Sequence, residues 1–154
     1  MILEETFVVD QPRDRVWTFF LTEVERVARC IPGVGDFDDL GGEHYHVTLT
    51  QKIGHLSATF DLKAALVDKE PEHRVTFTAA GRCVRGVRGD MSSKNQVELA
   101  DDAGGSTKVS LKCDLVLGGM VGSIGNKAVT AKAKVVVKEF ASKLSAEIQS
   151  WAAR

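Results

Sequence analysis

The C-terminal segment constrains the fold most, because it carries one long helical pattern without a proline or glycine after Gly125. Apolar residues advance there by steps of three or four, at Val129, Ala133, Val136, Phe140, Leu144, Ile148 and Trp151. This spacing predicts an amphipathic helix from Ser123 to Trp151. At 1.5 Å per residue such a helix is about 43 Å long, more than twice the mean globular length. It needs an equally long apolar surface to pack against.

The middle of the chain follows a period of two, which is the pattern of strands with one buried face. The clearest run is Leu56, Ala58, Phe60, Leu62, Ala64 and Leu66. Similar alternation occurs in Leu3–Val9, Tyr45–Leu49, Val75–Ala79, Val97–Leu99 and Val109–Leu117. Glycine-rich and Glu-Pro turns separate these runs, as antiparallel hairpins require. The pattern predicts a half-solvated antiparallel sheet.

Between the first strand and the sheet, the segment from Pro12 to Arg29 has helical spacing, and Pro32 and Gly33 end it. A break near Thr22 divides it into two short helices. The predicted order is a strand, two short helices, further strands and a long helix, which is typical of the α+β class. We expect one domain over residues 1–154, with a curved antiparallel sheet of about seven strands wrapped on the C-terminal helix.

Composition excludes several classes of function. The 44% apolar and 27% charged residues are ordinary globular values. The net charge is −1, and the one concentrated basic run, Arg82, Arg85, Arg88 and Lys94, has no interleaved aromatic residues, so no nucleic-acid partner is expected.

Cysteine content and hydropathy bear on the cellular location. The three cysteines are scattered, which predicts no disulfide framework and fits a reducing cytoplasm. No secretory signal opens the chain, since Glu4 and Glu5 follow the start at once. No run of about 20 apolar residues predicts a spanning helix. We therefore expect a cytoplasmic protein, with any membrane contact peripheral, at the inner face of the cell membrane.

No catalytic or metal-binding constellation stands out. His44 and His46 lie on one face of a strand that faces outward, and no third ligand is evident, so no metal site is predicted. The chain has no G-x-S-x-G nucleophile motif. The inward positions are nearly all apolar, and those that carry chemistry are Tyr45, Gln51, Ser93, Asn95, Thr107 and Cys113. We predict a protein that is not an enzyme and needs no cofactor.

A strongly curved sheet over one helix leaves space between the two layers, and ligand sites of this kind are concave and apolar. The predicted cavity residues are Trp17, Phe20, Tyr45, Phe60, Phe77, Leu111, Cys113, Met120, Val136 and Phe140. Glycine permits unusual backbone angles, so the glycine-rich segment before the helix is predicted to gate the cavity mouth. Its predicted gate residues are Gly118, Gly119, Met120, Val121, Gly122 and Ile124.

Three segments resemble the CoxG family, which is named for a component of carbon monoxide dehydrogenase. Asp-Arg-Val-Trp at 14–17 precedes Val27 to Gly33, which contains the family's Ala-x-Cys-Ile-Pro-Gly stretch. Gly105 to Val109 is similar to the family's turn into its last strand, and Gly118 to Gly125 to its glycine-rich approach to the long helix. The resemblance covers nearly the whole chain and places it among START and polyketide-cyclase helix-grip domains.

The resemblance implies an accessory protein that holds a lipid- or quinone-like molecule and serves a molybdenum hydroxylase that oxidises carbon monoxide. It would recruit that enzyme to the inner membrane surface or handle a quinone. Many relatives carry a C-terminal extension that contacts membrane, and this chain stops at Arg154. Two alternatives remain open: an aromatase/cyclase-type enzyme on the same fold, and a protein-interaction adaptor. Fold alone does not choose among them.

Overall fold

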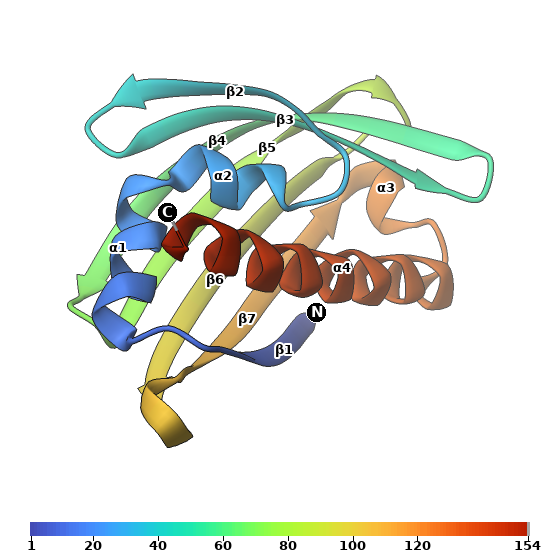
Figure 1. Cartoon of the computed structure of the whole chain (residues 1–154). Coiled ribbons are helices and arrows are strands. Elements are labelled where there is room, and N and C mark those ends of the chain that lie inside the picture. Colours follow the sequence, from blue (N-terminus) through green and yellow to red (C-terminus); the bar gives the residue numbers. More distant parts are fainter. Residues whose placement is uncertain (154) are drawn as a thin grey trace.

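The computed structural model describes residues 1–153 and contains a seven-stranded antiparallel sheet with the strand order β1-β7-β6-β5-β4-β3-β2 (Figure 1). The strands are β1 (Ile2–Val9), β2 (Val34–Gly41), β3 (His44–Ile53), β4 (Leu56–Glu70), β5 (Arg74–Gly86), β6 (Asp90–Asp101) and β7 (Thr107–Gly118). From β2 to β7 every strand pairs with its successor in sequence, and β1 closes the far edge by pairing with β7. The predicted α+β class is confirmed.

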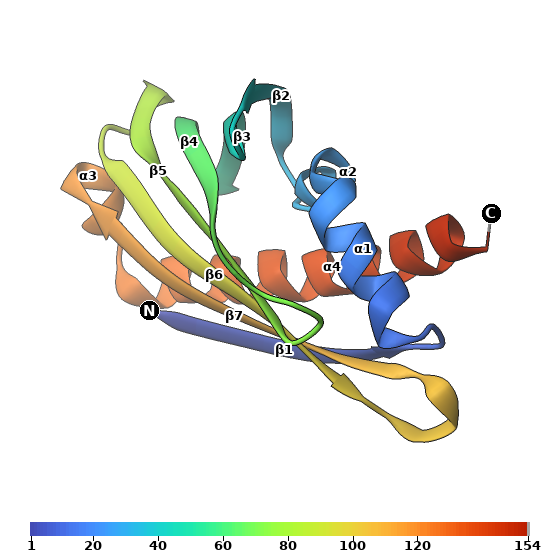
Figure 2. The same cartoon turned by 90° about the vertical axis from the view of Figure 1, so that its left-hand side faces the viewer.

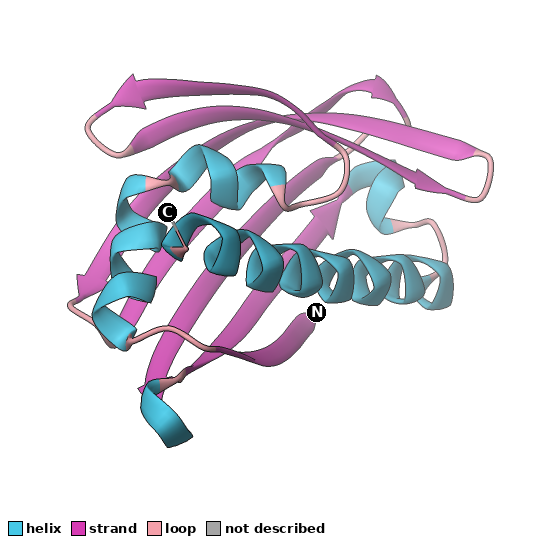
Figure 3. Ribbon diagram, viewed as in Figure 1, coloured by secondary structure: helices cyan, strands magenta, loops and turns pink. Residues whose placement is uncertain are grey.

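The helices lie almost entirely on one face of this sheet (Figure 3). They are α1 (Arg13–Thr22), α2 (Val24–Arg29), α3 (Gly119–Gly122) and α4 (Asn126–Ala152), with a short 3-10 turn η1 at Ala103–Gly105. The break near Thr22 and the long C-terminal helix are as predicted. The sequence pattern did not predict β2, whose acidic and glycine residues lack a clear alternation.

The sheet curves around α4, so that the helix lies in its concave face (Figure 2). Two register shifts between β4 and β5, one after Thr59 and one after Leu66, increase the local bend. Gly81 in β5 contributes as well, because a Cβ there would collide with the Asp61 carbonyl oxygen of β4. The absence of a side chain lets the two strands approach closely where the sheet bends.

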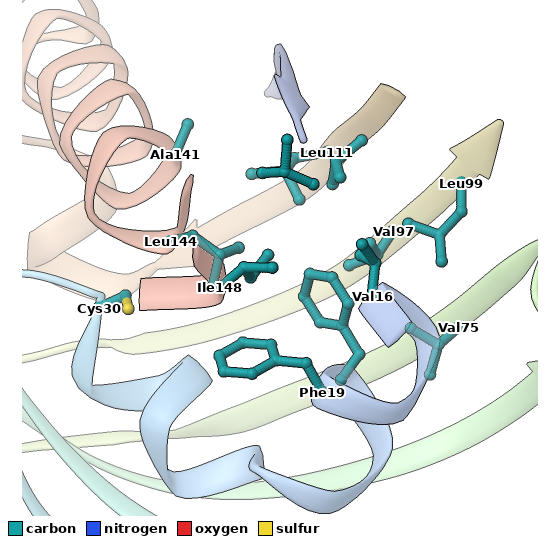
Figure 4. Packing of buried hydrophobic residues seen from close by; sticks show 13 residues of the cluster. Val16, Phe19, Cys30, Val75, Val97, Leu99, Leu111, Ala141, Leu144 and Ile148 are labelled. Atoms are coloured by element: carbon teal, nitrogen blue, oxygen red, sulfur yellow. The ribbon is translucent and has the colours of Figure 1, made fainter. Parts of the chain in front are cut away.

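The C-terminal half of α4 packs tightly against α1 and the sheet. Leu144 and Ile148 of α4 are fully buried, as are Phe19 and Phe20 of α1, and Ala141 is 6% exposed. The sheet supplies the facing side chains, which include Val75, Val97, Leu99, Val109 and Leu111 (Figure 4). We call this cluster the packed end.

Polar contacts fasten α4 to α1 and α2 at the packed end. Trp151 Nε1 donates a hydrogen bond to Glu23 at 2.9 Å, and the Arg15 guanidinium lies 4.3 Å from the Trp151 ring centroid. Arg26 pairs with Glu147 at 2.6 Å. These contacts join segments that are more than 120 residues apart in sequence, so they fix where the C-terminus of the long helix lies.

The opposite part of the molecule contains a separate buried cluster of Ala58, Phe60, Leu62 and Val121. It joins β4 to α3, and it does not include any residue of α4. The N-terminal half of α4 contributes only Val129 to the buried residues of the described chain. We call this part, between the second cluster and the packed end, the cavity end.

Candidate ligand cavity

A cavity of about 300 Å³ lies between the concave face of the sheet and the N-terminal half of α4. Its walls come from α2, from strands β2 to β7, from α3 and from α4. Almost all of the accessible wall is apolar. The volume is at the lower end of the range of about 300–1,000 Å³ that is typical of ligand pockets.

Small side chains on both layers create this space. Ala64, Ala79 and Ser93 are successive neighbours across β4, β5 and β6, so a row of short side chains crosses the middle of the sheet. The facing residues of α4 are also short, and they include Ala133, Val136 and Val137. The closest backbone approaches of α4 are to β1 and not to the central strands. The helix therefore spans the centre of the sheet without filling it.

Most of the predicted cavity residues lie on the cavity wall. They are Tyr45, Phe60, Phe77, Leu111, Cys113, Val136 and Phe140. The strand members follow the predicted parity, and the helical members follow the predicted stripe of α4. Whether these side chains contact a ligand is taken up below as a proposal.

Three predicted cavity residues lie elsewhere. Phe20 is fully buried in the packed end, and Trp17 packs against the same cluster from α1. Helix α1 crosses the C-terminal half of α4, so its apolar face meets the packed end and not the cavity. Met120 is 61% exposed, because the short helix α3 directs Val121 inward in its place.

The predicted gate segment is a tightly packed turn at one end of the cavity. Val121 and Ile124 line the cavity, whereas Gly118, Gly119 and Gly122 are not part of its wall. Gly119 has a φ of 68°, and a Cβ there would lie 2.9 Å from the Gly89 Cα of the β5–β6 hairpin. Close backbone packing thus accounts for this glycine, and a gating role stays a prediction.

Sequence reasoning missed the wall that α2 and β2 contribute. Val24, Val27 and Ile31 line the cavity from α2 and the turn after it, and Val34 and Phe37 line it from β2. The steps of three and four between the first three residues are a helical stripe that was available in the sequence. The edge strand gave no comparable signal.

The thiol of Cys113 is the most strongly perturbed acid on the cavity wall. Burial, together with the charge of Asp114, raises the pKa of Cys113 to about 11. The thiol is therefore neutral near pH 7 and behaves as a small, weakly polar wall group. Burial also raises the pKa of Tyr45, with Asp39 and Glu43 adding to the effect, so its phenol remains protonated.

On the outer face of the sheet, His46 forms hydrogen bonds to Asp38 on β2 and Asp61 on β4. Hydrogen bonds to Asp38 and then to Asp61 raise the pKa of His46, with burial opposing them. The histidine thus joins the edge strand to the two strands beside it. Within residues 1–153 no group of three or more His, Cys, Asp or Glu side chains is arranged to hold a metal ion.

A curved antiparallel sheet that grips a long helix over an apolar cavity defines the START-like helix-grip class of ligand-binding folds. The model of the CoxG family, described as the G component of carbon monoxide dehydrogenase, matches residues 6–149. The chain belongs to that family. No curated protein matches the sequence significantly.

Solved structures with the same fold are distant in sequence. A conserved protein from Geobacillus kaustophilus has a TM-score of 0.80 at 20% identity, over 96% of this chain and 94% of its own. A START superfamily protein from Mycobacterium smegmatis has a TM-score of 0.67 at 12% identity, over 97% and 98%. The Zhui aromatase/cyclase from Streptomyces sp. R1128 has a TM-score of 0.63 at 16% identity, over 97% and 93%. At these identities the likeness concerns the fold alone.

None of the helices within residues 1–153 has the length and apolarity needed to cross a membrane.

Proposed function

We propose that this protein is a non-enzymatic accessory protein that holds a lipid- or quinone-like apolar molecule between the sheet and α4. The observation that carries the proposal is the cavity of about 300 Å³ with an almost wholly apolar wall. Desolvating an apolar ligand against such a wall contributes roughly 25 cal/mol for each Å² of apolar surface buried. Polar metabolites would lose their hydration there without compensation.

The volume limits the size of the ligand. A dry cavity of about 150 Å³ lined by aliphatic and aromatic side chains is enough to take up benzene. The cavity here is about twice that size, so it suits a molecule of one or two rings, or the ring portion of a longer molecule. A long acyl or isoprenoid chain would have to extend beyond the cavity.

The chemistry of the wall favours binding over catalysis. The lining residues include no Asp, Glu or His that would act as a general acid or base near neutral pH. Cys113 has a pKa of about 11, which keeps it in the unreactive thiol form. The Zhui aromatase/cyclase shares the fold, and a cyclase of that type is the alternative function. It would require a titratable group to converge on the ligand.

Family membership supports the partner side of the proposal. The family is named for a component of carbon monoxide dehydrogenase. We therefore propose that the protein serves a molybdenum hydroxylase of that type, through membrane recruitment or quinone handling. A stable complex with purified carbon monoxide dehydrogenase, or binding to liposomes of anionic phospholipid, would each support one of these two roles.

The binding proposal is tested with menadione, a two-ring quinone, on protein stripped of bound lipid by organic extraction. Equilibrium dialysis should give one site with an affinity in the micromolar range, about 8 kcal/mol of binding free energy. Native mass spectrometry of the unextracted protein should reveal a copurifying apolar molecule. The cavity-filling variant Ala133→Trp should lose menadione binding, because Ala133 lies on the cavity wall.

The matched control is Ala131→Trp, which adds the same side chain at an exposed position of the same helix. It should bind menadione as the unmodified protein does. Equal binding by both variants would mean that the probe sits outside the cavity. No binding to the stripped protein, together with no copurifying molecule, would contradict the proposed function and favour the adaptor alternative.

A further inference from the structure

The apolar wall of the cavity is interrupted by two polar side chains, Ser93 and Asn95, on the central strand β6. Both point to the concave face, where Ser93 is the neighbour of Ala79 and Asn95 is the neighbour of Phe77 on β5. On the other side, Asn95 is next to Cys113 of β7. The two residues thus form one small polar area on the wall that faces α4.

Their hydrogen bonds fix the orientation of the Asn95 amide. Asn95 Nδ2 donates to Ser93 Oγ at 2.9 Å and to the Phe77 carbonyl oxygen at 3.4 Å. A flipped amide would set its oxygen against that carbonyl, so the observed orientation is the favourable one. Asn95 Oδ1 accepts no hydrogen bond from any residue in the described range 1–153, and it is not sealed in the protein interior.

The Ser93 hydroxyl is also only half used. Its oxygen accepts the bond from Asn95, while its proton has no acceptor among the described residues. The cavity wall therefore presents one available donor, the Ser93 O–H, beside one available acceptor, Asn95 Oδ1. A ligand that displaces water from this area without replacing both hydrogen bonds leaves polar groups unsatisfied.

We propose that Ser93 and Asn95 form a polar subsite that selects compact ring compounds bearing a neutral hydroxyl group. A hydroxyl oxygen accepts from Ser93 and its proton is donated to Asn95 Oδ1, so one group satisfies both. An ether or a carbonyl oxygen satisfies Ser93 alone, and a hydrocarbon satisfies neither. A carboxylate would bring its negative charge against Asn95 Oδ1. The inference rests on the proposed function, because it concerns the ligand of that same cavity.

The test compares three two-ring probes of similar shape: 2-naphthol, 2-methoxynaphthalene and naphthalene. Equilibrium dialysis measures the affinity of each for the stripped protein. We expect 2-naphthol to bind about tenfold more tightly than naphthalene, which corresponds to the combined net gain of two neutral hydrogen bonds. 2-Methoxynaphthalene, which only accepts, should bind clearly more weakly than 2-naphthol. Equal affinities for all three probes would overturn the subsite.

Variants assign the preference to the two residues. Ser93→Ala and Asn95→Leu should each weaken 2-naphthol binding severalfold and leave naphthalene binding unchanged or tighter. The control is Ser92→Ala, which alters the adjacent serine on the exposed outer face and should change neither affinity. An equal loss for 2-naphthol and naphthalene in the Ser93 and Asn95 variants would mean that these residues only shape the wall, and the proposal would fail.

The two levels of inference fail in different ways. If the unmodified protein binds none of the three probes and no menadione, the cavity does not hold a ligand and the proposed function is wrong. If it binds naphthalene and 2-naphthol equally well, the cavity function stands and the subsite is wrong. The comparison of probes on the unmodified protein decides this even if a variant fails to fold.

Discussion

The two halves of α4 lie over the same sheet, yet one half is packed and the other covers a cavity. At the packed end, Leu144 and Ile148 are fully buried against the rings of α1. At the cavity end, Ala133 and Val136 face a row of alanine and serine side chains across a space of about 300 Å³. The periodicity of the helix is the same in both halves. The difference lies in the size of the facing side chains and in the presence of α1.

This comparison separates two tasks within one small domain. The packed end holds the long helix in place, with its ring contacts, its Trp151 hydrogen bond and its Arg26 ion pair. A protein interior normally packs at the density of an organic crystal, so a space of this size is a cost in stability. The packed end offsets that cost, which allows the cavity end to remain open for a ligand.

The largest expected effect comes from the same truncation made in each region. Leu144→Ala should lower the free energy of unfolding by about 2–5 kcal/mol, since it removes a fully buried side chain from a close-packed cluster. Leu115→Ala on the cavity wall should cost less than about 2 kcal/mol, because part of that side chain already faces empty space. Urea denaturation of the stripped proteins measures both values. Equal losses would mean that the cavity end is packed as tightly as the other end.

Adding volume should reverse the order of tolerance. Ala141 of the packed end is 6% exposed, so Ala141→Leu should destabilise the protein by about 1–3 kcal/mol through overpacking. Ala133→Leu, two turns earlier on α4, extends into the cavity and should be neutral or stabilising by up to about 1 kcal/mol. Thermal unfolding of the two variants gives the comparison. A destabilised Ala133→Leu variant would argue that the cavity closes in solution.

The sequence was sufficient to predict the class of fold and the position of most cavity residues. Period-two alternation and the stripe on the long helix determine which side chains point inward, and this placed Phe77 and Phe140 correctly. It does not determine how α1 crosses α4, which is why Trp17 and Phe20 were assigned to the cavity. That crossing depends on tertiary contacts of Phe19 and Trp151, which lie far apart in the sequence.

Edge strands and tight turns were the least predictable parts. β2 is identified as a strand by its pairing with β3 and by its ion pairs, and its own residues show no alternation. Met120 is apolar, yet a single turn of helix points it outward. In both places backbone geometry outweighs the hydrophobic pattern, so a reading of side-chain type alone assigns these residues wrongly.

The smallest expected effect concerns how β2 is held at the cavity end. Hydrogen bonds to Asp38 and Asp61 raise the pKa of His46 in the folded protein. The stabilisation is therefore fully present below the unfolded pKa of about 6.5, and it is lost as the pH rises through the higher folded value. Because the pair is exposed, we expect about 0.5 kcal/mol.

Urea denaturation at pH 6 and pH 9 in low salt measures this difference, with His46→Gln as the variant and His44→Gln as the control on the same strand. The unmodified protein and the His44 variant should both lose stability between the two pH values relative to His46→Gln. Since β2 supplies Val34 and Phe37 to the cavity wall, naphthalene affinity should fall slightly over the same range. An identical pH dependence in all three proteins would mean that the ion pairs do not hold the edge strand, and that backbone pairing with β3 alone keeps this wall in place.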